Sequence, residues 1–171
     1  MMKSAAMARR AFGGSLGRLA AAALLAGCGF QLRQPPNFAF KSIYTGVSPT
    51  SALGSELKRN LAVVGKVDPT QQKRADVILD ILQELRQKIV VGTNSAGQVR
   101  EFQLRLTFRF RLRTPQGKEL IPETEMLQQR DISFNESAVL SKETEEALLY
   151  RSMQSDIVQQ LLRRLAAVKE I

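Results

Sequence analysis

The stretch from Glu101 to Arg113, with the sequence EFQLRLTFRFRLR, alternates strictly between apolar and polar residues. Successive side chains of a β-strand point to opposite faces of a sheet, so the pattern predicts a strand with one apolar and one polar face. At about 3.4 Å per residue this strand would run roughly 40 Å, which is longer than most strands. Its apolar face needs a cover of helices. Its polar face carries four arginines, which are Arg105, Arg109, Arg111 and Arg113.

Other alternating segments predict the neighbouring strands. Residues 38–44 indicate a short first strand, and residues 77–91 indicate a long second one. On the second strand one face holds the odd-numbered apolar residues Val77, Leu79, Ile81, Leu85, Ile89 and Val91, with Gln83 and Gln87 between them. Residues 120–134 predict a further strand, in which Pro122 indicates a bulge or a sheet edge. Gly117 suits the positive-φ position of the turn before it.

Two segments have the period of amphipathic helices. Residues 50–64 place Leu53, Leu57, Leu61 and Val64 on one face, with Ser48 or Ser51 as the N-cap and Gly65 at the end. Residues 142–168 carry a longer stripe made of Leu149, Met153, Ile157, Leu161, Leu165 and Val168. The predicted fold class is therefore α+β, a two-layer sandwich of a mostly antiparallel four-stranded sheet with two helices packed on one face.

Composition excludes several classes of function. The 171 residues include no histidine and one cysteine, Cys28, so His-based catalysis, Cys/His metal sites and an internal disulfide are excluded. The one Gly-x-Ser-x-Gly match, Gly13-Gly14-Ser15-Leu16-Gly17, lies within residues 1–27, and the chain has no histidine to activate its serine. We predict no catalytic residues, no metal, no cofactor and no enzyme activity. With no tryptophan and two tyrosines, the chain is poorly equipped to stack bases, and we predict no nucleic-acid partner.

The N-terminus has the pattern of an export signal. Residues 1–27 begin with basic and small residues and continue into a short apolar run, Leu19–Ala26, typical of a signal peptide. The run is too short for a membrane-spanning helix. Arg9-Arg10-Ala11-Phe12 is weakly similar to a twin-arginine signal, and the choice between that route and the Sec route stays open. Without these residues the net charge falls from +9 to +5, with 21 basic and 16 acidic residues.

The run ends in Leu25-Ala26-Gly27-Cys28, which resembles a bacterial lipobox. The resemblance implies a lipidated Cys28 at the N-terminus of the mature protein, and Gly29 after it implies sorting to the outer membrane. Several acyl chains on one residue, palmitate among them, anchor a protein stably. We predict a signal peptide at residues 1–27, a lipidated linker at 28–36 and a single α+β domain at 37–171.

Four short stretches in order resemble the LptE family of lipopolysaccharide-assembly lipoproteins. They are Cys28-Gly29-Phe30-Gln31-Leu32-Arg33, Phe40-Lys41-Ser42-Ile43-Tyr44, Gly97-Gln98-Val99-Arg100-Glu101-Phe102 and Val139-Leu140-Ser141-Lys142. The resemblance implies a protein of the Gram-negative cell envelope, anchored to the outer membrane from its periplasmic side. It further implies a position inside the LptD β-barrel and a part in delivering lipopolysaccharide to the outer leaflet. A lysine of the family that contacts lipopolysaccharide corresponds to Lys142, whereas a family arginine falls on Ser95.

The two long strands can be aligned by their apolar faces. If the numbers of opposite residues add to 191, Ile81 meets Phe110, Leu85 meets Leu106 and Ile89 meets Phe102. This register places Arg111 opposite Asp80, with Arg109 diagonal to Asp80 and Glu84. Such pairs contribute about 0.2–1 kcal/mol each and give these two arginines a structural role.

Toward the other end the same register brings like charges together. It places Arg105 opposite Arg86, and Lys88 opposite Gln103 with Arg100 nearby. A register shifted by two would place Arg105 opposite Glu84 or Lys88. Guanidinium groups match phosphate geometry, so the hypothesis is that this cluster and Lys142 bind lipid A phosphates. The alternatives are a solvated basic tip or a surface that faces acidic residues of the barrel. The competing function is an accessory lipoprotein of another barrel-assembly complex, without lipopolysaccharide binding.

Overall fold

The computed structural model of the chain describes residues 37–64 and 72–171. The predictions for the signal peptide, Cys28, the linker and the helix end at Gly65 lie outside these residues. Four strands form one sheet in the order β1-β2-β3-β4, with β1 parallel to β2 and the others antiparallel. Their bounds are Ile43–Thr45 for β1, Val77–Thr93 for β2, Val99–Arg113 for β3 and Glu119–Ser133 for β4.

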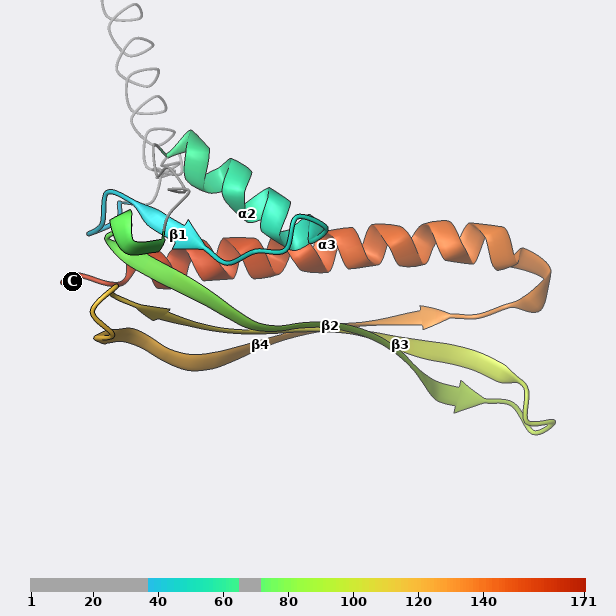
Figure 1. Cartoon of the computed structure of the whole chain (residues 1–171). Coiled ribbons are helices and arrows are strands. Elements are labelled where there is room, and N and C mark those ends of the chain that lie inside the picture. Colours follow the sequence, from blue (N-terminus) through green and yellow to red (C-terminus); the bar gives the residue numbers. More distant parts are fainter. Residues whose placement is uncertain (1–36, 65–71) are drawn as a thin grey trace, which may run out of the picture. The chain divides into compact units, whose positions relative to one another are not determined.

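Two α-helices cover one face of this sheet (Figure 1). Helix α2 spans Ala52–Val63 and helix α3 spans Val139–Ala166, with short 3-10 turns at Gln72–Arg74 and Glu136–Ala138. Helix α3 runs along the sheet, whereas α2 lies only over the half next to β1. We call that half proximal, and the half with the β2–β3 hairpin distal. The predicted fold class is confirmed. Among the described residues, no helix is both long enough and apolar enough to cross a membrane.

The core lies between the sheet and the helices, as the alternation in β3 predicts. Five side chains of β3 are fully buried there, namely Leu104, Leu106, Phe108, Phe110 and Leu112. Facing them are Met153, Ile157, Leu161 and Leu165 of α3 and Leu53, Leu57 and Leu61 of α2. Complete burial of one such side chain contributes about 1.5–3 kcal/mol, so this layer supplies most of the stability. Of the two candidate caps of α2, Ser51 is the one used, since its Oγ accepts from the Gly54 N–H at 2.8 Å.

The first strand is shorter than predicted. Only Ile43–Thr45 pairs with β2, although the pattern extends back to residue 38. The carboxylate of Asp76 explains the difference, because its Oδ2 accepts from the backbone N–H groups of Lys41 at 2.8 Å and Ser42 at 3.0 Å. The Asp76 side chain thus takes the place of backbone hydrogen bonds between β1 and β2 at this point. Burial alone would raise the pKa of Asp76, but these hydrogen bonds outweigh it and the pKa lies below its ordinary value.

The turns agree with the sequence pattern. Gly117 has a φ of 96° in the β3–β4 turn, as predicted, and Gly97 has a φ of 78° in the β2–β3 turn. Only glycine adopts such values readily. The predicted irregularity at Pro122 is also confirmed, because Phe110 pairs with Thr124 whereas Leu112 pairs with Ile121. Strand β4 is an edge of the sheet.

Candidate functional site

The β2–β3 pairing follows the predicted register at the proximal end and departs from it beyond Leu82. Asp80 lies opposite Arg111, as predicted. Leu82 is then an extra residue on β2, a β-bulge, after which Gln83 pairs with Arg109. One extra residue reverses the face on which the following side chains lie, here as far as Val90, where the pairing shifts again. The bulge therefore decides which charges face the helices.

In the distal half, the even-numbered side chains of β2 face the helices. Arg86 lies opposite Leu106 and Lys88 lies opposite Leu104, both of which are core residues of β3. The predicted placement of Leu85, Ile89 and Val91 on the core face is therefore wrong. Val91 is 48% exposed and Leu85 is 39% exposed.

The predicted contact between Arg105 and Arg86 is also wrong. Arg105 lies opposite Gln87 on the face of the sheet away from the helices, and its Nε donates to Gln103 at 2.7 Å. The register is displaced by one residue, which is neither the predicted register nor the alternative displaced by two. The like charges that pattern reasoning brought together lie on opposite faces of the sheet.

At the proximal end, acidic neighbours hold the arginines of β3. Asp80 Oδ2 accepts from Arg111 Nε at 2.8 Å and from Arg113 Nε at 2.7 Å. Burial by itself would raise the pKa of Asp80, yet these hydrogen bonds together keep that pKa below its ordinary value. Arg109 differs from the prediction, because its partner is Glu123 of β4 rather than Asp80 or Glu84. These arginines have structural partners.

Arg86 lies within a polar network between β2 and α3. Its guanidinium carbon is 5.4 Å from the ring centre of Tyr150, whose hydroxyl donates to the Gln87 carbonyl at 2.8 Å. The buried amide of Gln154 is satisfied when its oxygen accepts from Arg86 Nη2 at 2.7 Å and from the Leu53 N–H at 3.2 Å. Burial and the charge of Glu146 raise the pKa of Tyr150 above its ordinary value.

Lys88 and Lys142 line a common hollow with an aromatic wall. Lys88 Nζ is 2.7 Å from Glu146 Oε2 and 4.4 Å from the ring centre of Phe102. Lys142 Nζ donates to Glu145 at 2.8 Å and to Ser133 Oγ at 3.0 Å. The hollow has a volume of about 130 Å³, and its lining also includes Ile132, Phe134 and Val139. Two ammonium groups therefore adjoin a small apolar recess.

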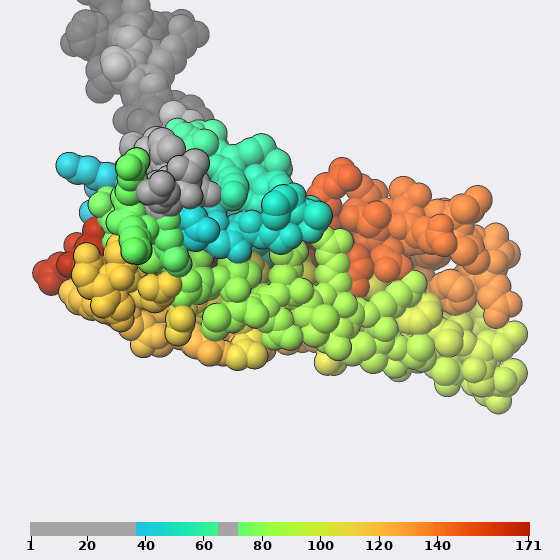
Figure 2. Space-filling model, in the orientation of Figure 1, coloured from blue at the N-terminus to red at the C-terminus, as the bar shows by residue number. Residues whose placement is uncertain are grey.

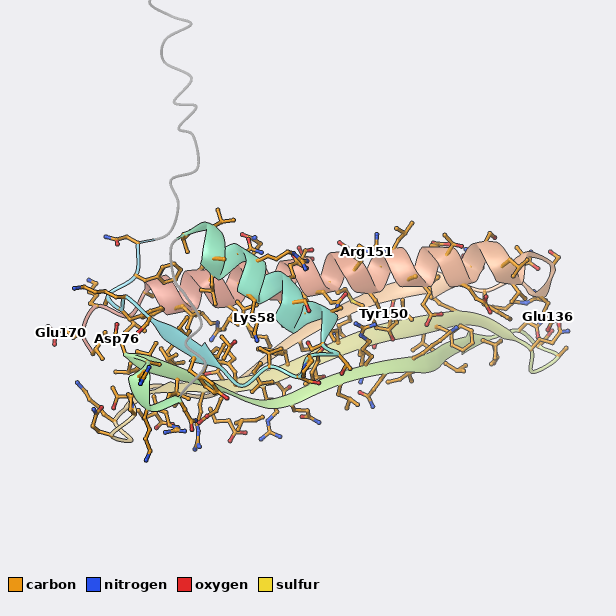
Figure 3. All side chains as sticks on the ribbon, turned by 45° about the horizontal axis from the view of Figure 1, so that its top comes forward. Lys58, Asp76, Glu136, Tyr150, Arg151 and Glu170 are labelled. Atoms are coloured by element: carbon orange, nitrogen blue, oxygen red, sulfur yellow. The ribbon has the colours of Figure 1, made fainter. Side chains whose placement is uncertain are left out.

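A second, more open hollow continues along α3. It has a volume of about 670 Å³ and shares Lys88, Glu143 and Glu146 with the first. Its other lining residues are Ala52, Arg86, Ala147, Tyr150, Arg151 and Gln154. Figure 3 places Tyr150 and Arg151 in the middle of α3. We call the two hollows together the α3 groove.

The α3 groove brings together three of the five predicted basic residues, which are Arg86, Lys88 and Lys142. Arg100 lies nearer the hairpin, where its Nη2 donates to Gln98 at 3.1 Å, and Arg105 lies on the opposite face. Sequence reasoning missed the helix side of the groove. Glu146, Tyr150 and Gln154 recur every four residues, and this spacing places them on one line beside the apolar stripe. That polar line is the signal that could have revealed the groove.

Comparison with known proteins gives a family match over most of the chain. Residues 40–165 match the family described as "LptE: Lipopolysaccharide-assembly". The chain is 30% identical to an uncharacterized lipoprotein B from Nitrosomonas europaea, whose solution structure superposes with a TM-score of 0.70. The match covers 81% of this chain and 91% of that one. No curated protein matches the sequence at a significant level.

Two crystal structures share the fold at lower identity. A minor lipoprotein from Acinetobacter baumannii is 20% identical with a TM-score of 0.63, over 77% of this chain and 94% of that chain. Rare lipoprotein B from Shewanella oneidensis is 16% identical with a TM-score of 0.64, over 74% of this chain and 94% of that one. These two likenesses support the architecture, and the family match carries the inference about function.

Proposed function

Because the chain belongs to the LptE family of lipopolysaccharide-assembly lipoproteins, which are not enzymes, we propose that it binds lipopolysaccharide in the α3 groove. In this proposal it partners and plugs the LptD β-barrel and assists insertion of lipopolysaccharide at the outer leaflet. Cys28 would carry the lipid that anchors it to the outer membrane from the periplasmic side.

One observation supports the groove above other surfaces: Lys88 and Lys142 line the same hollow as Phe102 and Phe134. Lipid A presents phosphates next to acyl chains, so a receptor for it needs cations beside an apolar surface. An ammonium group binds phosphate as a point charge and tolerates several geometries. Arg86 would extend this cationic surface along the groove, and Arg100 would add charge at the hairpin end.

Both lysines already have carboxylate partners, which an incoming phosphate would have to replace. Lys88 pairs with Glu146, and the two side chains are 36% and 24% exposed. Lys142 pairs with Glu145, at 22% and 49% exposed. Ion pairs this accessible are worth about 0–1 kcal/mol, so exchanging a carboxylate for a more highly charged phosphate costs little. The glutamates would keep the lysines in place while the groove is empty.

Binding of lipopolysaccharide to the mature chain tests the groove. We expect Lys88→Gln combined with Lys142→Gln to weaken binding about 5–30-fold, the equivalent of about 1–2 kcal/mol for two exposed charge contacts. Thermal stability should change little. Arg105→Gln is the matched control, since it removes a charge of the same strand pair from the opposite face and should leave affinity unchanged. Equal binding by the double variant would remove the groove from the proposal.

Extraction from membranes tests the partner separately. A tagged mature chain with Cys28 intact should co-purify with a large β-barrel in detergent. Recovery of the chain alone would count against the barrel partner. Co-purification with a barrel, combined with unmeasurable lipopolysaccharide affinity, would favour the accessory role in another barrel-assembly complex.

A further inference from the structure

Strand β2 has an unused edge in the distal half of the sheet. Among the described residues its strand partner on that side is β1, which ends at Thr45 opposite Leu79. One hydrogen bond follows, from the Gly46 N–H to the Leu79 carbonyl at 3.3 Å. Beyond this point no strand within residues 37–64 and 72–171 pairs with that edge. Figure 2 shows the green atoms of β2 at the surface beyond α2. An open edge of this kind offers backbone donors and acceptors to another chain.

The hydrogen-bond pattern of the sheet identifies which backbone groups of β2 point away from β3. Phe134 N–H donates to the Arg100 carbonyl at 2.7 Å, so even-numbered residues of β3 bond toward β4 and odd-numbered ones toward β2. Past the bulge, Arg86, Lys88 and Val90 lie opposite even-numbered residues of β3. Their N–H and C=O groups therefore point outward. Three such residues provide up to six hydrogen bonds for an added strand.

The side chains along this edge define what kind of strand would fit. On the helix side, the wide part of the α3 groove is lined by three cations, Arg86, Lys88 and Arg151, and by two carboxylates, Glu143 and Glu146. Arg86 and Lys88 belong to β2 itself, so they would be the direct cross-strand neighbours of an added strand. On the other face, Leu85 lies opposite Thr107 and is 39% exposed, and Ile89 lies opposite Gln103. Acidic side chains toward α3 and apolar side chains on the other face would complement both sets.

The charges also argue against two other arrangements. If two copies of this chain paired through β2, Arg86 and Lys88 would face one another, and like charges directly opposite destabilise a strand pair. The second edge of the sheet, β4, carries Pro122 and four acidic residues, which are Glu119, Glu123, Glu125 and Asp131. That edge would repel an acidic strand. Charge thus favours the edge of β2 and a partner of opposite sign.

We propose that β2, from Arg86 to Val90, accepts an extended segment of a partner protein by β-strand addition. The segment alternates acidic residues, which face α3, with apolar residues on the other face. Backbone hydrogen bonds would supply affinity and the alternating side chains would supply selectivity. This inference does not require lipopolysaccharide binding, because the added strand would bond to the backbone of β2, but its acidic side chains would meet Arg86 and Lys88, which also line the α3 groove.

A synthetic peptide tests the proposal on the mature chain. The probe is a capped, fluorescent hexapeptide of alternating glutamate and valine, and the comparison peptides carry lysine for glutamate or N-methyl groups on alternate amides. We expect the acidic peptide to bind and to shift the amide resonances of Arg86, Lys88 and Val90. The lysine peptide and the peptide methylated on its strand-facing amides should bind at least tenfold more weakly. Equal binding by either would overturn the proposal.

Proline variants of the protein complete the test. Val90→Pro removes an outward N–H without breaking the β2–β3 ladder, and an edge strand tolerates such a proline. We expect it to weaken peptide binding at least tenfold. Gln129→Pro places the same residue at an outward N–H of β4 and should leave binding unchanged. Unaltered binding by Val90→Pro, or dimerisation of the wild-type chain through the same amides, would refute the proposal. If Val90→Pro fails to fold, the methylated peptide still decides.

Discussion

Replacing Asp80 with asparagine tests whether the arginines at the proximal end of β3 stabilise the sheet by pairing with this carboxylate. The carboxylate is 19% exposed and holds two guanidinium groups, of which Arg111 is 45% exposed and Arg113 is 24% exposed. An exposed pair is worth about 0.2–1 kcal/mol, and a hydrogen bond to a charged group about 1.5–3 kcal/mol. Discounting the more exposed Arg111, we expect Asp80→Asn to lower the free energy of unfolding by about 2 kcal/mol. For a domain of this size that lowers Tm by about 6–8 °C.

The stability difference between wild type and Asp80→Asn should also depend on pH, in a direction that the pKa of Asp80 determines. Hydrogen bonds from both arginines outweigh burial and depress the pKa of folded Asp80, whereas the unfolded chain has a value of about 3.9. A group with a depressed folded pKa stabilises the protein above the unfolded value, and that contribution is lost as the pH falls through the folded pKa. Urea unfolding should therefore show the full difference between wild type and Asp80→Asn at neutral pH. The difference should shrink below about pH 4 and vanish in stronger acid.

Asp156→Asn is the matched control. Asp156 accepts from Arg130 at 2.9 Å, but these side chains are 46% and 39% exposed and form a single pair. We expect this substitution to change the free energy of unfolding by about 0.5 kcal/mol or less. The reasoning is refuted if the two variants are equally stable. It is also refuted if Asp80→Asn still has a lower free energy of unfolding than wild type at a pH where the wild-type carboxylate is protonated.

Three further predictions concern the core, helix α2 and the bulge. Phe108 is fully buried, so Phe108→Ala should lower the free energy of unfolding in urea by about 3–5 kcal/mol. Gly54→Ala should cost about 1–2 kcal/mol in the same assay despite the better helix propensity of alanine, because its Cβ would lie 1.6 Å from Val47 Cγ1. Adding Val47→Ala should recover only part of that loss, because Val47 Cβ would still lie 2.9 Å from the new methyl group. Deleting Leu82 should close the bulge without changing the face of any other side chain. We expect stability within about 1 kcal/mol of wild type and unchanged cross-strand NOEs in the distal half, whereas a new register there would contradict the assignment of Leu82.

The fold was predictable from the sequence because periodicity reports burial directly. The strict alternation in β3 and the four-residue spacing in α3 correspond to the side chains that are buried against one another. The family resemblance added the expectation of lipopolysaccharide assembly, which the match over residues 40–165 supports. These parts depend on patterns that extend over many residues, so one irregular position does not alter them.

The candidate site was only partly predictable because it depends on a single residue. Leu82 interrupts the pairing of β2, but its local sequence, Ile81-Leu82-Gln83, fits a regular strand as well as a bulge. The odd-numbered apolar residues Leu85 and Ile89 made the regular strand the natural interpretation. A bulge is stabilised by tertiary contacts, here Arg86 on Tyr150 and Lys88 on Glu146, and those contacts join residues about 60 positions apart. Strand periodicity alone contains no information on them.

The bulge also divides the domain into two halves that differ in packing and charge. In the proximal half two helices cover the apolar face, and Asp80 and Glu123 pair with the arginines on the other face. In the distal half α3 is the one described helix that covers the sheet, and charged residues of β2 replace apolar ones beneath it. A region with fewer buried apolar contacts opens at lower cost, and binding surfaces are drawn from such regions. One inserted residue therefore turns Arg86 and Lys88 toward α3, leaves Arg105 on the far face, and makes the distal half the part of the domain where an anionic lipid or an acidic strand can be accommodated.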